Sequence, residues 1–314
     1  MAMKDFGGKV AVVTGGGTGM GRELVRQLVA EGASVAMCDL FAETMAETVS
    51  LCEADGVPQG VRITSHVADV GDEEQVKRFA AEVARDHKTD HIHLLFNNAG
   101  IGGGGSFVLD DREEWDRVFQ ICWFGVYYSC RAFFPMLERA SEGHIINTSS
   151  ANGFWAALMP GVSQTAYSAA KFAVKGFTEA LVTDLRNYAP HIKASIVMPG
   201  GVGTPIGLNS RRVLSGEMTE VSRRKLRQHL KMIGVEGADV MDDTALEAAQ
   251  AMLAKRFQEL APTSAARAAT IILDGVKAER WRILVGEDAE RLDRRVRAEP
   301  ERAYDPDFLA YAVE

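Results

Sequence analysis

The chain alternates between short apolar runs and longer amphipathic stretches. The short runs are rich in β-branched residues and predict buried strands at 10–14, 34–39, 63–69, 93–96, 144–148, 192–198 and 282–285. Between them, apolar residues recur at helical spacing, as in the stretch that contains Leu24 and Leu28 and ends at Gly32. Strands that alternate with helices predict a parallel sheet with right-handed crossovers and helices on both faces. The expected fold class is therefore α/β, a doubly wound seven-stranded parallel sheet.

Two of the predicted helices carry further signals. Asp72 with Gln75 three residues later resembles a capping box and predicts a helix start. A long helix is predicted where Trp115, Val118 and Cys122 recur at helical spacing.

Two regions depart from this alternation. Residues 206–260 are polar and helical in pattern and contain no predicted strand, and residues 287–314 follow the last strand. We expect residues 1–314 to form one domain, with 206–260 as an insertion and 287–314 as a C-terminal extension. The sequence does not decide whether this extension wraps a neighbouring subunit or covers a pocket.

Composition narrows the classes of function. The 314 residues are 46% hydrophobic and 25% charged, and the formal net charge of -8 disfavours nucleic acid or an anionic membrane as a partner. The four cysteines form no C-x-x-C pair, so we expect neither disulfides nor a zinc site, and no other metal site is evident. The chain has no signal-peptide pattern and no apolar run of the ~20 residues that span a bilayer. We expect a soluble, cytoplasmic protein.

A glycine-rich turn follows the first predicted strand and opens the first helix. Its sequence, TGGGTGMG at 14–21, allows the backbone to approach a pyrophosphate at the helix N-terminus. Asp39 ends the second strand, where a carboxylate can accept hydrogen bonds from a ribose 2′-hydroxyl and repel a 2′-phosphate. No arginine or lysine follows it closely, so NAD is predicted rather than NADP. Asp39 as the cap of the next turn is the alternative.

Tyr167 and Lys171 lie four residues apart in a helical stretch and therefore share one helix face. A free phenol titrates near pH ~10, and a nearby ammonium favours the phenolate and lowers its pKa. The pair is a plausible acid/base unit that moves a proton on or off an oxygen.

Five elements now stand in one order: TGGGTGMG at 14–21, Asp39, NNAG at 97–100, YSAAK at 167–171 and PGGVGT at 199–204. Together they closely resemble the short-chain dehydrogenase/reductase family, whose fold is a Rossmann-type dinucleotide-binding domain. The resemblance covers about residues 8–205 and the last strand. It implies an NAD-dependent enzyme that commonly forms homodimers or homotetramers.

The resemblance also assigns roles. It makes Tyr167 the acid/base, and Lys171 the residue that binds the nicotinamide ribose and lowers the tyrosine pKa. It makes Ser150, in TSSANG at 148–153, the hydroxyl that holds the substrate oxygen, with Ser149 as the alternative. Asp69 is expected to face the adenine, although a capping or turn role is an alternative. Besides Asp39, Asp69, Tyr167 and Lys171, the expected cofactor contacts are Gly15, Thr18, Gly19, Met20, Gly21, Val70, Asn97, Ala99, Gly100, Pro199, Gly200, Val202 and Thr204.

One position departs from the family pattern. Cys122 stands where the family usually has an asparagine, which helps to hold a chain of water running to the lysine. We expect the hydride step to remain and the pH profile to change.

The family places its substrate lid directly after the nicotinamide loop, which makes 206–260 the expected lid. It holds a basic cluster that is expected to be mainly a solvated helix face; pairing with an acidic substrate is the alternative. The cluster comprises Arg211, Arg212, Arg223, Arg224, Lys225, Arg227 and Lys231.

The sequence therefore predicts an NAD-dependent oxidoreductase of a secondary alcohol or ketone. A bulky, hydrophobic substrate is expected because five apolar residues are predicted beside the pocket: Phe107, Phe154, Trp155, Leu158 and Met159. An NADPH-linked carbonyl or acyl-thioester reductase is the alternative, and a non-catalytic NAD(H)-sensing protein is a further one.

Overall fold

The protein is built around one parallel sheet of seven strands in the order β3-β2-β1-β4-β5-β6-β9. A computed structural model describes residues 3–103, 105–158, 162–214, 219–305 and 307–308. The strands are β1 Val10–Thr14, β2 Ser34–Asp39, β3 Ile63–Val67, β4 Leu94–Asn97, β5 Gly143–Thr148, β6 Ile192–Pro199 and β9 Arg282–Val285. The predicted fold class is confirmed, with strand ends that differ by one or two residues.

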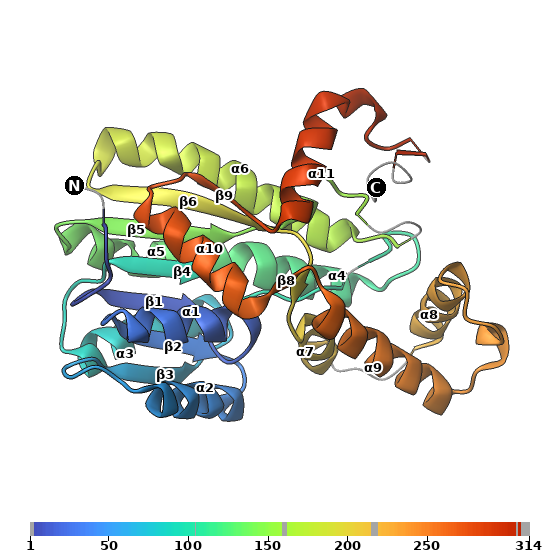
Figure 1. Ribbon diagram of the computed structural model, residues 1–314, viewed down its shortest axis with the longest axis horizontal. Helices are drawn as coiled ribbons and strands as arrows, with labels where there is room; N and C mark the ends of the chain where they lie inside the picture. Colours follow the sequence, from blue (N-terminus) through green and yellow to red (C-terminus); the bar gives the residue numbers. More distant parts are fainter. Residues whose placement is uncertain (1–2, 104, 159–161, 215–218, 306, 309–314) are drawn as a thin grey trace.

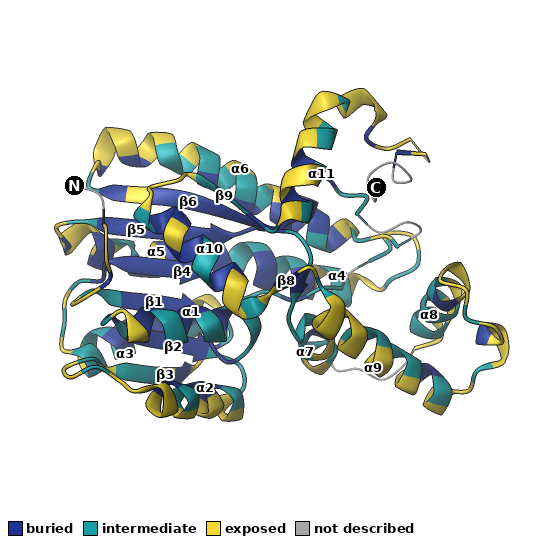
Figure 2. Cartoon of the chain, viewed as in Figure 1, coloured by how far each residue is buried: buried dark blue, intermediate teal, exposed yellow. Residues whose placement is uncertain are grey.

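Helices cover both faces of this sheet. The helices are α1 Gly19–Ala30, α2 Ala42–Asp55, α3 Glu73–His87, α4 Arg112–Phe119, α5 Gly125–Arg139, α6 Thr165–Tyr188, α7 Ile206–Val213, α8 Glu220–Met232, α9 Asp243–Leu260, α10 Ala265–Lys277 and α11 Glu287–Ala298. One apolar core joins α3, α4, α5 and α6 to the sheet, and a second joins α1, α2 and α10 to the opposite face. In Figure 2 the strands are largely buried, whereas α8 and α9 are mostly exposed or intermediate.

Strand order reverses between β1 and β4, because the chain runs outward from β1 through β2 to β3 before it returns to β4. In open α/β sheets, ligands bind beyond the carboxyl ends of the strands at such a switch point. Figure 1 shows α7 beyond this edge of the sheet, with α8 and α9 extending further away.

Two features were not predicted. A second sheet of two very short parallel strands pairs β7 (Val202–Gly203) with β8 (Thr263–Ser264) and thereby closes off the 206–260 segment at its base. The predicted long helix through Cys122 is interrupted by a π-helical turn, Gln120–Phe124, between α4 and α5. Such turns are frequent at functional sites.

The predicted helix start at Asp72 is confirmed. Its carboxylate accepts hydrogen bonds from the backbone N–H groups of Glu74 and Gln75, at 3.0 and 3.1 Å. The Gln75 side-chain oxygen accepts from Asp69 N at 3.1 Å. The cap thus shapes the turn that follows β3.

Candidate active site

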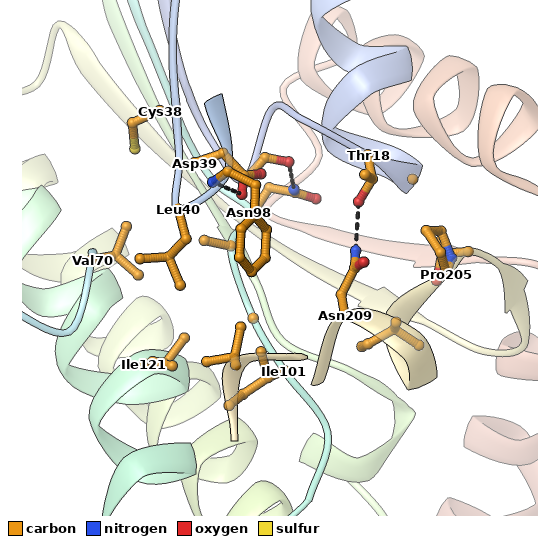
Figure 3. Close-up of a pocket in the computed structure, with 18 of the residues that line it drawn as sticks. Thr18, Cys38, Asp39, Leu40, Val70, Asn98, Ile101, Ile121, Pro205 and Asn209 are labelled. Atoms are coloured by element: carbon orange, nitrogen blue, oxygen red, sulfur yellow. Dashed lines mark hydrogen bonds between the residues drawn. The ribbon is translucent and has the colours of Figure 1, made fainter. Parts of the chain in front are cut away.

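A cavity lies at the carboxyl ends of β1, β2 and β4, the position that the switch point indicates (Figure 3). It encloses about 140 Å³. Ten of the predicted cofactor residues line it: Gly15, Thr18, Gly19, Met20, Asp39, Asp69, Val70, Ala99, Gly100 and Thr204. The other seven, Gly21, Asn97, Tyr167, Lys171, Pro199, Gly200 and Val202, do not line it.

The glycine-rich turn is packed so closely that side chains would not fit. A Cβ atom at Gly21 would lie 1.9 Å from Gly15 O, and Gly19 has φ 55 with the Thr204 side chain 3.0 Å from its Cβ position. Thr18 is the N-cap residue of α1, yet its side chain forms no cap hydrogen bond. The Thr18 side chain therefore does not occupy the first-turn N–H groups of α1. A pyrophosphate that binds at a helix N-terminus needs such N–H groups as donors.

Asp39 closes one end of the cavity. Its carboxylate accepts hydrogen bonds from Gly17 N at 3.0 Å and Phe41 N at 3.4 Å. Burial raises the pKa of Asp39, and these backbone N–H groups act in the opposite direction. The predicted selector of the ribose therefore lies at the end of β2 within the cavity.

Asp69 combines the two roles that the sequence left open. It lines the cavity, and its carboxylate also accepts from Gly71 N at 2.9 Å and pairs with Arg117 at 2.6 Å. Arg117 and the turn thus occupy part of its hydrogen-bonding capacity. Val70, directly after it, also lines the cavity.

The two asparagines after β4 face opposite ways. Asn97 is buried and donates to Asn147 Oδ1 at 2.8 Å, away from the cavity. Asn98 lines the cavity instead and donates to Thr14 O at 3.1 Å. Because side chains alternate along a strand, one residue of offset decides which asparagine reaches the cofactor side. Sequence reasoning named Asn97 and missed Asn98.

Three predicted catalytic residues gather next to the cavity. Tyr167 and Lys171 share one face of α6, and Ser150, directly after β5, lies close enough to the phenol to lower its pKa. Lys171 is 2% exposed; its Nζ donates to Thr148 O at 2.9 Å and lies 5.5 Å from the centre of the Tyr167 ring. Ser149 instead donates to Lys171 O at 2.7 Å. Of the two serines, Ser150 is thus the one whose hydroxyl acts on the phenol.

The pKa of Tyr167 differs from the expectation. Burial raises it, the neighbouring Cys122 raises it further, and only the hydrogen bond from Ser150 lowers it. Burial also lowers the pKa of Lys171. The desolvation of the phenolate therefore outweighs the influence of the ammonium in the cofactor-free site.

The first helix of the 206–260 segment lies against the cavity. Ile206, Asn209 and Val213 of α7 line it, and Asn209 donates to Thr18 Oγ1 at 2.8 Å (Figure 3). Helix α7 thus forms one wall of the cavity. The Asn209 contact gave no signal in the sequence, because it joins residues that are distant along the chain.

An arginine from a distant part of the chain contacts the turn that follows Asp39. The Arg212 guanidinium of α7 lies 3.5 Å from the centre of the Phe41 ring and pairs with Glu43. The remaining cluster is largely paired within the segment, as with Arg223 and Asp243. Lys225 pairs with Asp110. This pairing favours the interpretation of the cluster as a structural and solvated face.

The predicted apolar pocket residues need a correction. Trp155 is 1% exposed and packs under the C-terminal segment, whereas Phe107 is 81% exposed. Neither lines the cavity described above. Phe154 and Leu158 are partly buried beside Trp155, and Met159 lies outside the described residues.

Comparison with known proteins gives a consistent result. The family model described as short chain dehydrogenase matches residues 9–214. SadH of Mycobacterium tuberculosis is 36% identical over 231 residues, covering 72% of this chain and 80% of that protein. Levodione reductase of Leifsonia aquatica is 32% identical over 214 residues, covering 68% and 76%. A short-chain dehydrogenase/reductase of Burkholderia phymatum, solved in complex with NAD, superposes with a TM-score of 0.76 at 28% identity, covering 97% of this chain and 98% of that chain.

The chain belongs to the short-chain dehydrogenase/reductase family. It is thus an oxidoreductase of a family that binds a nicotinamide cofactor and acts on small molecules. The residues present fit such a cofactor: the close-packed glycines leave the backbone accessible, and both Asp39 and Thr204 line the cavity.

As a short-chain dehydrogenase/reductase, the protein has an unusual residue in its π-helical turn. Cys122 is fully buried and its thiol donates to Ile101 O at 3.2 Å. A Cβ atom at Gly100 would lie 3.7 Å from Cys122 Sγ and 3.5 Å from Lys171 Nζ, so the thiol and the ammonium face the same point of the backbone. The thiol therefore belongs to the surroundings of the catalytic lysine.

The described residues include no group of three or more His, Cys, Asp or Glu side chains placed to bind a metal. No helix among them is both long and apolar enough to cross a membrane.

Proposed function

We propose that the protein is an NAD-dependent oxidoreductase that transfers a hydride between the nicotinamide and a secondary alcohol or ketone. The observation that carries this proposal is that Ser150 lies beside Tyr167, with the buried Lys171 one turn away, next to a cavity that Asp39 lines. Residues 1–314 act as one catalytic domain, and 206–260 serves as its substrate lid.

The protein supplies the proton chemistry and the positioning. When bound, the nicotinamide supplies the hydride acceptor or donor. Tyr167 takes the alcohol proton during oxidation and returns it during reduction, while Ser150 holds the substrate oxygen. Lys171 presents an ammonium group to the nicotinamide ribose and to the phenolate that forms. Thr204, at the cavity edge, is placed to bind the carboxamide.

Replacement of Tyr167 tests the catalytic assignment. Tyr167→Phe is expected to lower turnover by ~10²–10⁴, the usual contribution of an acid/base, because the phenol oxygen is lost. Tyr188, which is 83% exposed on the same helix, provides the matched control as Tyr188→Phe. Rates are followed at 340 nm with aliphatic, aromatic and steroid-like secondary alcohols. Near-normal activity of Tyr167→Phe would refute the assignment, and NADH binding without turnover on any substrate in the wild type would favour the sensing protein.

Replacement of Asp39 tests the choice of cofactor. A hydrogen bond to a charged group contributes about 1.5–3 kcal/mol, so Asp39→Ala is expected to lower kcat/KM for NAD by about 10- to 100-fold. The same change removes a repulsive charge and should raise kcat/KM for NADP. An NAD/NADP preference unchanged by Asp39→Ala would refute the role of Asp39 as selector. A wild-type preference for NADPH would favour the alternative reductase.

The substrate proposal rests on the residues that remain at the pocket. Phe154 and Leu158 support an apolar substrate, although the removal of Trp155 and Phe107 from the pocket weakens the argument for a bulky one.

The aromatic surface of the α4–α6 region supports a homodimer or homotetramer. Tyr127 is 38% and Phe172 is 42% exposed there, next to Trp123 and Phe177. Four buried free cysteines, Cys38, Cys52, Cys122 and Cys130, support a reducing compartment such as the cytoplasm.

A further inference from the structure

The C-terminal segment contacts both loops that flank the catalytic residues. Helix α11 follows β9 directly and stands at the carboxyl-end side of the sheet (Figure 1). Its first turn touches the loop after β6, and its continuation to Phe308 covers the segment after Ser150. The sequence left the role of residues 287–314 open, and the structure shows the described part packed on its own chain.

The first contact fixes the nicotinamide loop. Asp288 Oδ2 accepts a hydrogen bond from Gly201 N at 2.6 Å. A Cβ atom at Gly200 would lie 2.3 Å from the same oxygen, so the carboxylate rests directly against the loop backbone. Asp288 Oδ1 is buried and has no hydrogen-bond partner in the described part of the chain. A half-buried carboxylate that accepts a hydrogen bond from the loop backbone therefore links the first turn of α11 to this loop.

The second contact fixes the segment that carries Ser150. Trp155 Nε1 donates to Ala303 O at 2.7 Å, and the Trp155 and Phe308 rings pack edge to face at 5.4 Å. Phe308 is 0% exposed. Trp155 N also bonds to Ala151 O at 3.0 Å, in the short 3-10 turn directly after Ser150. A shift of Trp155 would therefore be transmitted to that turn.

The segment between the two contacts is itself held to the sheet. Arg282 of β9 pairs through both guanidinium NH groups with Asp293 of α11, and Arg297 donates to Asp293 at 2.9 Å. Asp293 is 6% exposed. Because Arg282 belongs to the strand, α11 cannot tilt without breaking this pairing.

We infer that the segment from Glu287 to Phe308 is a brace, with Asp288 and Trp155 as positioning residues that set the nicotinamide loop relative to Ser150. This inference rests on the proposed function, since it concerns the geometry of hydride transfer. Small misplacements of reacting groups cost large factors in rate. The brace acts through the loop and the turn and touches neither substrate nor cofactor.

The test compares Asp288→Ala with Asp288→Asn and with Glu290→Ala. The asparagine keeps an oxygen acceptor for Gly201 N, and Glu290 is an exposed acid on the same helix whose carboxylate lies 3.9 Å from Arg294. Asp288→Ala is expected to lower kcat by about 10- to 100-fold, the value of a hydrogen bond to a charged group, with the NADH Kd changed by less than about threefold. Asp288→Asn should recover most of the rate, and Glu290→Ala should behave as the wild type.

A second measurement does not depend on activity. Hydrogen exchange of the peptide containing 199–204 in the cofactor-free protein should accelerate by about tenfold or more in Asp288→Ala and remain slow in Asp288→Asn. Phe308→Leu, chosen because Phe308→Ala could fail to fold, should red-shift the Trp155 emission, measured as the difference from a Trp155→Phe background. It should also lower kcat without changing exchange at 199–204.

The outcomes separate the inference from the proposed function. Wild-type exchange and wild-type kcat in Asp288→Ala would overturn the brace and leave the proposed function intact. A fall in kcat that matches a fall in the number of NADH-binding sites would show misfolding alone and would also overturn it. A wild-type protein without hydride transfer on any substrate would refute the proposed function, while the exchange measurement would still test the contact.

Discussion

A buried chain of hydrogen bonds joins the strand that leads to Ser150 with the helix that carries Tyr167. Asn97 Nδ2 donates to Asn147 Oδ1 at 2.8 Å, and Asn147 Nδ2 donates to Thr178 Oγ1 at 3.0 Å. Thr178 in turn donates to Val174 O at 2.7 Å. Thr178 and Asn147 are both 0% exposed, so no water can replace a lost partner from outside. Within this chain of hydrogen bonds, the Thr178 hydroxyl is the link between β5 and α6.

Thr178→Val removes that hydroxyl at nearly constant volume. The amide of Asn147 then loses its acceptor, and an unsatisfied buried group costs about 1–3 kcal/mol. Val174 O keeps its place in the helix and adds little, so we expect a loss of about 2 kcal/mol in the free energy of unfolding. Thr178→Ser keeps the hydroxyl and loses one methyl group, which costs about 1 kcal/mol. The two variants therefore separate the hydrogen bond from the packing.

Thermal unfolding measures the difference, at fixed protein concentration and without cofactor, because ligand and oligomerisation both shift the midpoint. For a chain of this size about 1 kcal/mol corresponds to roughly 2 °C, so Thr178→Val should lose about 4 °C and Thr178→Ser about 2 °C. The NADH Kd should not change in either variant, since Thr178 lies outside the cavity lining. A Thr178→Val protein as stable as Thr178→Ser would refute the argument that the hydroxyl satisfies Asn147.

Three further predictions concern pH and the contact of α7. Burial raises the pKa of Tyr167, so the rate of alcohol oxidation, which needs the phenolate, should rise with pH well into the alkaline range. Ser150→Ala removes the interaction that lowers this pKa, so the pH at which the residual rate rises should increase. An unchanged pH–rate profile in Ser150→Ala would contradict this prediction. Burial lowers the pKa of His144 from 6.5 to about 3, so its contribution to stability is present above pH 6.5 and is lost as the pH falls toward 3. In His144→Gln the midpoint temperature of unfolding should therefore depend less on pH across that range. The same pH dependence in the variant and the wild type would count against the assignment. Arg212→Ala should speed NADH release by about two- to fivefold in stopped flow, because the contact with Phe41 is lost. Arg211→Ala, which removes the pairing with Glu247 instead, should not change the release rate. Equal release rates in both variants would show that the Arg212–Phe41 contact does not retain the cofactor.

The sheet was predictable because each of its seven strands leaves an apolar, β-branched run in the sequence. The strands β7 and β8 were not, since two residues each are too short to form a pattern. The π-helical turn was missed for a related reason: one extra residue in a turn hardly disturbs apolar spacing over a helix. Local periodicity therefore identifies the layers of the fold and overlooks the short elements that connect them.

The site was predictable where a motif fixes both residue and backbone, as at Gly15, Asp39 and Tyr167. Trp155 shows the limit of such motif-based prediction. An aromatic residue near the predicted catalytic serine suits a pocket wall and a buried core equally well, and only the fold shows that Phe308 covers it. Arg212 is a further example, because its contact with Phe41 joins two residues that lie far apart in the sequence. Long-range packing decides such residues, and no local pattern carries it.

Cys122 shows how far one substitution changes the chemistry. An asparagine, which the family resemblance leads us to expect at this position, would supply a donor and an acceptor, whereas a thiol is a weak donor. That donor is used by Ile101 O, so the tie between the π-helical turn and the loop after β4 persists. No amide remains to hold a water toward Lys171, whose ammonium donates to Thr148 O. In the proposed reaction the hydride geometry depends on Ser150, Tyr167 and the nicotinamide loop, whereas the thiol donates to Ile101 O and affects Tyr167 by raising its pKa. The substitution should therefore act on the supply of protons to Lys171 and leave the alignment of the reacting groups unchanged.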